Sequence, residues 1–191
     1  MAENTLEKII EKKINKINNL KKNITIESLN KKITENNSFI DFKEKIEKNI
    51  KSNKISIIAE IKKASPSAGV IIKDYDPLKI AKIYESNKAT CLSVLTEEDF
   101  FFGNLMHISK IKQKINLPIL CKDFFIDPFQ VHLAKSYGAD AILIIIAGVN
   151  DKLADQLYEE AQKLNMSVIV EVHTIEEAKK ALRFNEALIG I

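Results

Sequence analysis

The sequence predicts an α/β protein built around a parallel β-sheet. From residue 55 onward, short apolar runs rich in β-branched residues alternate with amphipathic stretches of helical periodicity. Repeated units of this length demand parallel strands joined by right-handed crossovers. Two architectures satisfy this pattern, a (β/α)8 TIM barrel and an open doubly wound sheet. Because no G-x-G-x-x-G follows the first run and charged residues follow several runs, the barrel is favoured.

Sequences that start helices separate the predicted strands. The strands are expected at residues 55–61, 91–95, 118–121, 141–146, 168–172 and 188–191. Between them, a helix-capping side chain precedes each amphipathic stretch, and proline follows two of these caps at the first helical position. The expected caps are Asp76, Asp127, Asn150 or Asp151, and Thr174.

Residues 1–51 predict a helical extension that precedes the barrel strands of residues 52–191. Apolar residues recur there at helical spacing, with Lys, Glu and Asn between them. The mixed charges of the polar face favour packing against the main domain over binding to a membrane surface or a partner. We therefore expect three amphipathic helices that form an added layer on the barrel.

Composition limits the classes of function. The 191 residues are 46% hydrophobic, enough for one sizeable core, and the net charge of +3 suits an anionic small molecule but is too weak to indicate nucleic-acid binding. The longest apolar run is too short to span a bilayer. Cys91 and Cys121 form no CxxC pair, so reduced, buried thiols in a cytoplasmic protein are expected.

The predicted barrel is incomplete. A closed (β/α)8 barrel has about eight strands and typically about 250 residues, whereas about six strands are predicted here. The stretch from Ala187 to Ile191 reads as a strand without a following helix, cap or polar tail. We therefore expect a truncated or interrupted reading frame, with the first and sixth strands as open edges.

Charged residues emerge from several apolar runs and form the candidate active site. Glu60 and Lys62 lie at the end of the first strand and share one face of it, Lys122 follows the third strand, and Glu171 lies at the end of the fifth. Since the carboxyl ends of parallel strands meet at one edge, two ammonium and two carboxylate groups should converge. The alternative is a structural ion-pair cluster. Because barrel interiors are normally filled by branched apolar residues, a purely structural cluster of charges there would be unusual, and the interpretation as an active site is favoured.

Other polar and aromatic residues allow two interpretations each. The loop from Ser65 to Gly69 has hydroxyls that could hold a phosphate, or it is an ordinary turn. The aromatic run of residues 100–102 is either an apolar lid or a buried loop anchor. His107 and His132 lie in helical stretches without a second ligand at metal spacing, so no metal is expected and both are interpreted as surface or half-buried residues.

Seven segments, in order, resemble the indole-3-glycerol-phosphate synthase family of tryptophan biosynthesis. They are IIAEIKKASPSAG, DPLKIAKIYE, LSVLTEEDFFFG, LPILCKDFFIDPFQ, GADAILIIIA, VIVEVHTIEEA and LIGI. The resemblance runs from about Leu6 to the last residue and includes a helical extension before the first barrel strand. It implies a carbon-carbon lyase that closes 1-(2-carboxyphenylamino)-1-deoxyribulose 5-phosphate to indole-3-glycerol phosphate, losing carbon dioxide and water without a cofactor.

The resemblance also implies roles for the four charged residues. Lys122 matches the lysine of the family's KDF motif and would act as general acid at the ketose carbonyl oxygen. Lys62 matches a first-strand lysine that contacts the anionic substrate and assists dehydration. Glu171 matches a carboxylate that serves as base or electrostatic partner, and Glu60 matches a first-strand glutamate whose proton role stays open.

Three further residues match substrate contacts of the family. Ser65 matches a phosphate contact, and Phe101 and Phe124 match aromatics that pack on the anthranilate ring. Two departures stand out: Ala68 replaces a usual lysine, and Lys88 replaces a glycine common before the second strand.

The family continues past LIGI into an Asn-Asn-Arg-Asn-Leu motif and two more strands that hold the phosphate. Residues 1–191 alone are therefore expected to show little or no turnover. The alternatives are a non-catalytic fragment or decayed gene product that binds ligand or a complementing piece, and another phosphate-binding barrel such as phosphoribosylanthranilate isomerase. The oligomeric state is left open.

Overall fold

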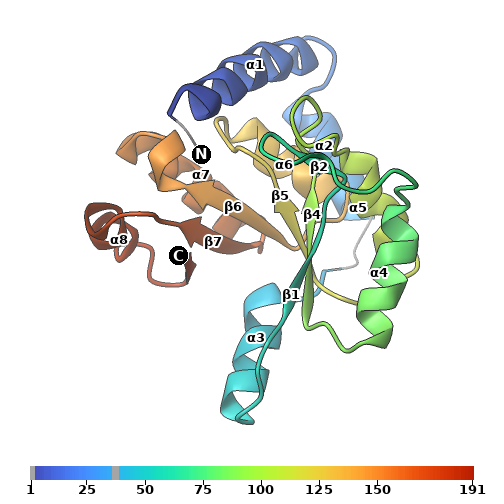
Figure 1. Ribbon diagram of the computed structural model, residues 1–191. Coiled ribbons are helices and arrows are strands. Elements are labelled where there is room, and N and C mark those ends of the chain that lie inside the picture. Colours follow the sequence, from blue (N-terminus) through green and yellow to red (C-terminus); the bar gives the residue numbers. More distant parts are fainter. Residues whose placement is uncertain (1–2, 36–38) are drawn as a thin grey trace.

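A curled sheet of parallel strands forms the centre of the molecule (Figure 1). The computed structural model describes residues 3–35 and 39–191. The sheet order is β1-β4-β5-β6-β7-β8, and every pairing in it is parallel. The strands are β1 (Ile58–Ile61), β4 (Cys91–Leu95), β5 (Ile119–Lys122), β6 (Ala141–Ile145), β7 (Ser167–Glu171) and β8 (Leu188–Gly190). The described residues thus supply six strands of an α/β barrel that closes with eight.

Capped helices return the chain from the end of one strand to the start of the next. As predicted, Asp76, Asn150 and Thr174 each accept a backbone N–H of the first helical turn. Asp127 accepts the N–H of Phe129, so the helix there begins one residue later than its Asp-Pro pair suggested. The connecting helices are α4 (Pro77–Ser86), α5 (Leu105–Lys112), α6 (Phe129–Ser136), α7 (Asp151–Lys163) and α8 (Ile175–Ala181), with a 3-10 turn η1 (Ile146–Gly148) after β6.

The two faces of the sheet bury separate hydrophobic clusters, because successive side chains of a strand point to opposite faces. The outer cluster joins strand residues such as Ile61, Val94 and Ile144 to the connecting helices. The inner cluster lies on the concave face and takes its members from strands and from the N-terminal segment. These members are Ile9, Phe42, Ile46, Cys91, Leu120, Phe124, Ala141, Leu143, Ile145 and Ile169.

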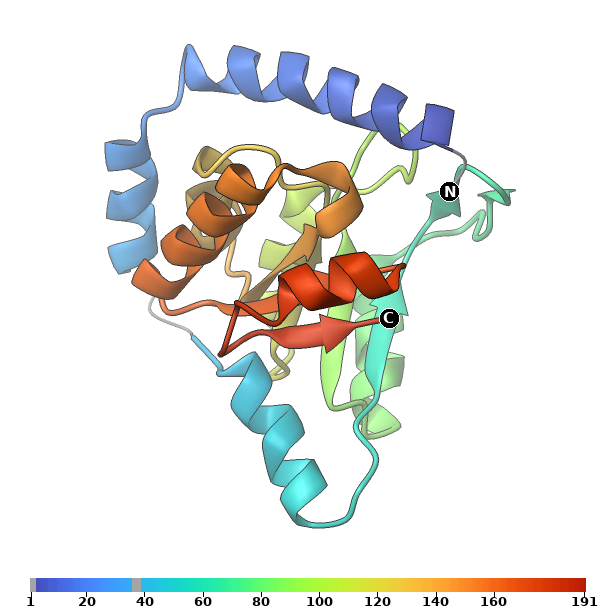
Figure 2. The same cartoon turned by 90° about the vertical axis from the view of Figure 1, so that its left-hand side faces the viewer.

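The N-terminal segment covers both ends of the concave face. It forms α1 (Glu3–Lys21), α2 (Ile26–Glu35) and α3 (Phe42–Lys51). Figures 1 and 2 show α1 across the carboxyl ends of the strands and α3 at the opposite end. Ile9 of α1 and Phe42 of α3 are fully buried in the inner cluster. The helices therefore close the space that the curled sheet encloses; the division of the chain at residue 51 stays a prediction.

Three details differ from the sequence-based expectations. The first strand begins at Ile58 rather than at residue 55, and the Ile55 side chain is exposed. A short hairpin, β2 (Ala64–Ser65) paired with β3 (Gly69–Val70), follows β1 and was not predicted. His132 is buried rather than at the surface, because Asn30 and Glu160 bind its two ring nitrogens at 2.6 and 2.8 Å.

The strands β1 and β8 are the edges of this sheet among the described residues. Their side chains Ile58 and Ile189 are 39% and 42% exposed. Unpaired apolar edges of this kind pair readily with other chains. No helix in the described part of the chain is long and apolar enough to cross a membrane.

Asp140 joins the amino end of the barrel to the N-terminal segment. Its carboxylate pairs with Lys112 at 2.5 Å and accepts the N–H groups of Ile40 and Ile119 at 2.9 and 2.8 Å. The Asp140 and Lys112 side chains are only 1% and 7% exposed. Removing one residue of such a pair is costly, because the charge of the other residue stays buried without a partner.

Replacing Asp140 should therefore destabilise the protein strongly. We expect Asp140→Ala to lower the free energy of unfolding by about 3–5 kcal/mol, measured by urea denaturation. Lys48→Ala is the control, because Lys48 and Glu44 form an ion pair in which both side chains are more than half exposed; it should change stability by less than about 1 kcal/mol. Equal losses in the two variants would contradict the role assigned to Asp140.

Lys88 precedes β4 in a left-handed conformation, with a φ of 64°. A side chain in this conformation costs roughly 1–2 kcal/mol, which glycine avoids at some entropic cost in the unfolded chain. Lys88→Gly should therefore raise the free energy of unfolding by about 0.5–1 kcal/mol. Lys88→Ala keeps the Cβ atom and should give no such gain. Urea denaturation of both variants tests this, and a gain in Lys88→Ala as large as that in Lys88→Gly would count against strain as the cause.

Candidate active site

A pocket of about 420 Å³ lies at the carboxyl ends of the strands, next to the N-terminal helix α1. Strand ends, the β2–β3 hairpin and α1 all contribute to its wall. Six of the seven residues singled out from the sequence belong to this wall or its lining: Lys62, Ser65, Phe101, Lys122, Phe124 and Glu171. The remaining lining residues are Thr5, Pro66, Ser67, Leu95, Asp123, Leu143 and Ile145.

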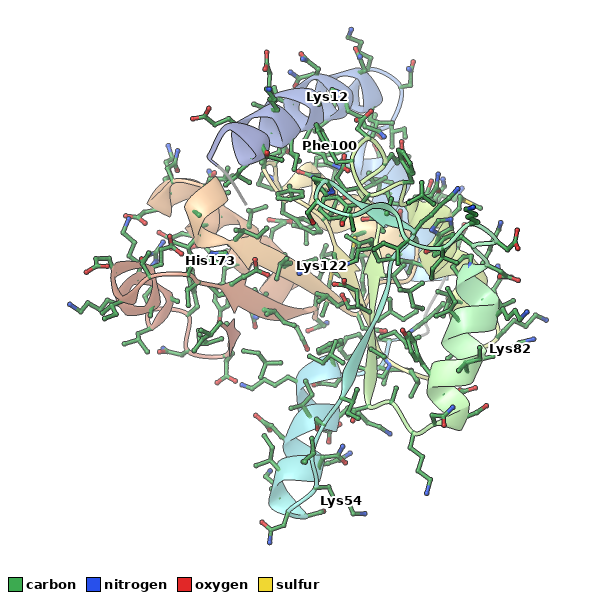
Figure 3. The ribbon with its side chains drawn as sticks, in the orientation of Figure 1. Lys12, Lys54, Lys82, Phe100, Lys122 and His173 are labelled. Atoms are coloured by element: carbon green, nitrogen blue, oxygen red, sulfur yellow. The ribbon has the colours of Figure 1, made fainter. Side chains whose placement is uncertain are left out.

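Two ion pairs bring the four predicted charges together. Lys122 Nζ lies 3.3 Å from Glu171 Oε2, although β6 separates their two strands in the sheet. Both side chains reach the concave face because each ends its strand on the inward position. Figure 3 places Lys122 in the centre of the molecule. These side chains are 31% and 24% exposed, so the pair is partly hydrated rather than buried.

Glu60 and Lys62 form the second pair, with their charged atoms 2.6 Å apart. Strand alternation predicted that they share a face, and the short distance confirms it. Their side chains are about one-third exposed, so this pair is also partly hydrated rather than buried. Lys62 lines the pocket, whereas Glu60 is absent from its lining and reaches it only through Lys62.

Three other polar residues near the strand ends lie outside the pocket lining. Thr96 is buried outside the pocket lining, and its hydroxyl donates to Asp123 at 2.7 Å. His173 is 56% exposed and stands 3.5 Å from Glu171, outside the pocket lining (Figure 3). Ser93 is buried, and its hydroxyl has no hydrogen-bond partner in the described part of the chain.

The β2–β3 hairpin presents hydroxyl groups at the pocket. Ser65 and Ser67 both line it, and their hydroxyl oxygens lie 3.4 Å apart. The Ser65 hydroxyl also accepts the N–H of Ala68 at 3.2 Å, which closes the turn. The loop is therefore a closed turn whose hydroxyls border the pocket.

Two aromatic rings form the apolar wall of the pocket. Phe101 and Phe124 stand with ring centroids 6.2 Å apart. Phe101 lies on a loop held by the buried carboxylate of Glu97, which accepts the N–H groups of Phe100 and Phe101 at 2.7 and 3.1 Å. Phe100 lies under α1, where the Lys12 ammonium is 5.0 Å from its ring centroid (Figure 3). The aromatic run is thus fixed by hydrogen bonds to Glu97.

Some lining residues were not anticipated from the sequence. Leu143 and Ile145 of β6 could have been found by strand alternation, since both point inward. Asp123 follows Lys122 directly in the KDF motif. Thr5 comes from α1, and nothing in its local sequence signals that it lines a pocket of the barrel.

Burial shifts the pKa values of both thiols and of one histidine. Burial raises the pKa of Cys91 and Cys121 to about 12, so both stay protonated. Burial also lowers the pKa of His107, which packs edge-on against Tyr75. Within residues 3–35 and 39–191, no group of three or more His, Cys, Asp or Glu could hold a metal ion.

A curled parallel sheet with helices on its outer face places the protein in the class of α/β barrel folds, and charged side chains gather at the carboxyl ends of its strands. A solved structure supports the fold: 3-keto-L-gulonate-6-phosphate decarboxylase from Vibrio cholerae aligns with a TM-score of 0.52. The alignment covers 71% of this chain and 62% of that one at 14% identity, so it shows the fold alone.

Sequence comparison identifies the family. The profile of the family "Indole-3-glycerol phosphate synthase" matches residues 6–191, and the chain belongs to this family. The synthase of Aliarcobacter butzleri is 44% identical over 97% of this chain, and that of Trichodesmium erythraeum is 40% identical over 98% of it. The synthase of Prochlorococcus marinus is 45% identical over 100% of this chain. The alignments span 71%, 63% and 64% of these three relatives, so the chain corresponds to about two-thirds of their length.

The loop that carries Phe101 depends on Gly103. A Cβ atom added there would lie 2.4 Å from the carbonyl oxygen of Leu95, so the backbone would have to shift. We expect Gly103→Ala to lower the free energy of unfolding by about 1–3 kcal/mol, measured by urea denaturation. Gly148→Ala is the control, because its Cβ would meet only ordinary contacts at 3.7 Å or more. If Gly103→Ala were as stable as that control, the loop would not be tightly packed.

Proposed function

We propose that this protein contributes the catalytic centre for the synthesis of indole-3-glycerol phosphate. The substrate is 1-(2-carboxyphenylamino)-1-deoxyribulose 5-phosphate, and the products are indole-3-glycerol phosphate, carbon dioxide and water. One observation carries the proposal: in a chain of this family, Lys62 and Lys122, each paired with a carboxylate, line one pocket beside an aromatic wall. The groups in this pocket match the parts of the substrate.

The anthranilate ring would lie against Phe101 and Phe124, the aromatic side chains of the wall. Its carboxylate and the phosphate are anionic, and Lys62 and Lys122 are the cations of the pocket lining. The hydroxyls of Ser65 and Ser67 are suited to hydrogen-bond phosphate oxygens. The proposed partner is thus a small anionic molecule, in keeping with the net charge of +3.

Ring closure needs an acid at the ketose carbonyl. The ring carbon that bears the carboxylate bonds to the carbonyl carbon, and the carbonyl oxygen takes a proton from the Lys122 ammonium to become a hydroxyl. Carbon dioxide then leaves, and its bonding electrons restore the aromatic ring. Glu171, 3.3 Å from Lys122, holds the ammonium in place before the transfer.

Dehydration completes the indole ring. The new hydroxyl leaves as water after it receives a proton, and the adjacent carbon that is bonded to the nitrogen loses a proton to form the double bond of the indole ring. We assign the donor role to Lys62 and the acceptor role to Glu171, which both line the pocket. Glu60 orients the Lys62 ammonium at 2.6 Å. The step uses only protein side chains and draws on no cofactor.

We also propose that the protein works in the cytoplasm. Its two cysteines are free and buried, and their thiols are protonated at neutral pH, which fits a reducing compartment.

Because residues 1–191 alone are expected to show little or no turnover, the assay uses the full-length gene product and follows the fluorescence of indole-3-glycerol phosphate. Residues 1–191 contain no tryptophan, so none of their side chains adds indole fluorescence to the rise that the product causes. We expect Lys122→Met to lower kcat by roughly 10²–10⁴-fold, the usual contribution of a general acid, with a smaller change in KM. Lys82→Met, on the exposed side of α4 (Figure 3), is the control and should keep the wild-type kcat.

Two results would contradict the proposal. Undiminished kcat in Lys122→Met would remove Lys122 from the acid role. A wild-type protein that forms no product and does not alter the fluorescence of added indole-3-glycerol phosphate would contradict the function as a whole. Binding of the product without turnover would instead indicate a ligand-binding protein that does not catalyse the reaction.

A further inference from the structure

A buried lysine lies on the inward face of the N-terminal helix α1. Ile9, Lys13 and Ile17 follow one another at four-residue spacing, and they are 0%, 5% and 4% exposed. Residues four apart stack on one side of a helix, so Lys13 occupies a position where an apolar residue is expected. An ammonium group there is tolerated only with a partner.

The partner is Asp123, the residue that follows Lys122 on β5. Lys13 Nζ lies 2.6 Å from Asp123 Oδ1, and the two side chains are 5% and 9% exposed. The carboxylate also accepts the Thr96 hydroxyl at 2.7 Å and the N–H of Phe124 at 2.8 Å. Asp123, which follows the last residue of β5, is thus held from α1, from Thr96 just after β4 and from the neighbouring N–H of Phe124.

This network controls the backbone that carries two pocket residues. Lys122 and Phe124 flank Asp123 in sequence, and both line the pocket. Thr96 fixes the same backbone a second time, because its N–H donates to the Lys122 carbonyl at 3.1 Å. A change in the position of Asp123 therefore moves the Lys122 ammonium and the Phe124 ring together.

Two other ion pairs of α1 lack this connection. Lys16 pairs with Glu98, and Lys21 pairs with Asp127. In both pairs the side chains are between 27% and 42% exposed, and neither acid adjoins Lys122. Exposed pairs of this kind tether a helix weakly.

Buried ion pairs are poor net stabilisers, since well-packed apolar residues of similar size often replace them without loss. The charge at Lys13 therefore calls for a reason other than stability. We propose that Lys13 and Asp123 are positioning residues, which set the geometry of Lys122 and Phe124 from the N-terminal helix. The role in turnover rests on the proposed function.

The test compares Lys13→Met with Lys16→Met in the complete protein. Methionine keeps the length of the lysine stem and removes only the charge. We expect Lys13→Met to lower kcat about 10- to 100-fold with a KM within about threefold of wild type, because misplacement of the acid affects the transition state most. Lys16→Met should stay within about twofold of wild type in both constants. The indole fluorescence assay supplies the rates.

A merely structural role predicts a different pattern. It would lower the midpoint of thermal unfolding while leaving kcat per folded molecule at the wild-type value, and this outcome would overturn the proposal. If Lys13→Met does not fold, Lys13→Met/Asp123→Asn replaces it, since this variant leaves no unpaired charge buried. It should show the same loss of kcat, and wild-type kcat in this variant would equally overturn the proposal.

Amide hydrogen exchange separates this inference from the proposed function. The Phe124 N–H donates to Asp123, so its exchange should become at least tenfold faster in Lys13→Met and should not change in Lys16→Met. If the wild type neither forms nor binds the product but this difference appears, the proposed function is wrong and the positioning network stands. If Phe124 exchanges equally in both variants, the positioning network is wrong, whatever the activity.

Discussion

The structure depends on one constraint: the concave face of the curled sheet must be covered at both of its ends. The residues before β1 provide a cover at each end. At the amino end, Phe42 of α3 is fully buried against the strands, and at the carboxyl end Ile9 of α1 is buried in the same hydrophobic cluster. Burial of apolar area at about 25 cal/mol per Å² favours both contacts. Because α1 lies over the carboxyl ends, the charged side chains there line a pocket rather than an open surface.

Two buried aspartates fix the positions of α3 and α1 on the barrel. Asp140 binds the N–H of Ile40 just before α3 and pairs with Lys112, while Asp123 pairs with Lys13 of α1. Apolar contacts are not directional, so they hold a helix against a sheet without defining its position closely. Hydrogen bonds and ion pairs are directional, and a buried carboxylate tolerates little displacement of its donors. The hydrophobic clusters thus supply the affinity of the N-terminal segment for the barrel, and the aspartates define its placement.

Much of this arrangement could be predicted from the sequence. Alternating apolar runs and helix caps predicted six parallel strands, and the emergence of Lys122 and Glu171 from such runs predicted their meeting, because both signals are local and periodic. The network of Lys13 and Asp123 could not be predicted, since it joins residues 110 positions apart and a single lysine on a helix normally faces water. The burial of His132 escaped prediction for the same reason: its partners Asn30 and Glu160 lie on other helices.

Each of the two ion pairs orders a lysine that is proposed to donate a proton to the substrate. A free lysine side chain would lose about 2 kcal/mol of rotamer entropy when it is ordered against a substrate. Pairing with Glu60 and Glu171 restricts Lys62 and Lys122 beforehand, so part of this loss is already met in the folded protein. Lys62 Nζ lies 2.6 Å from Glu60, and Lys122 Nζ lies 3.3 Å from Glu171. Both ammonium groups are proposed proton donors, so each has to turn from its carboxylate toward a substrate oxygen before it transfers its proton.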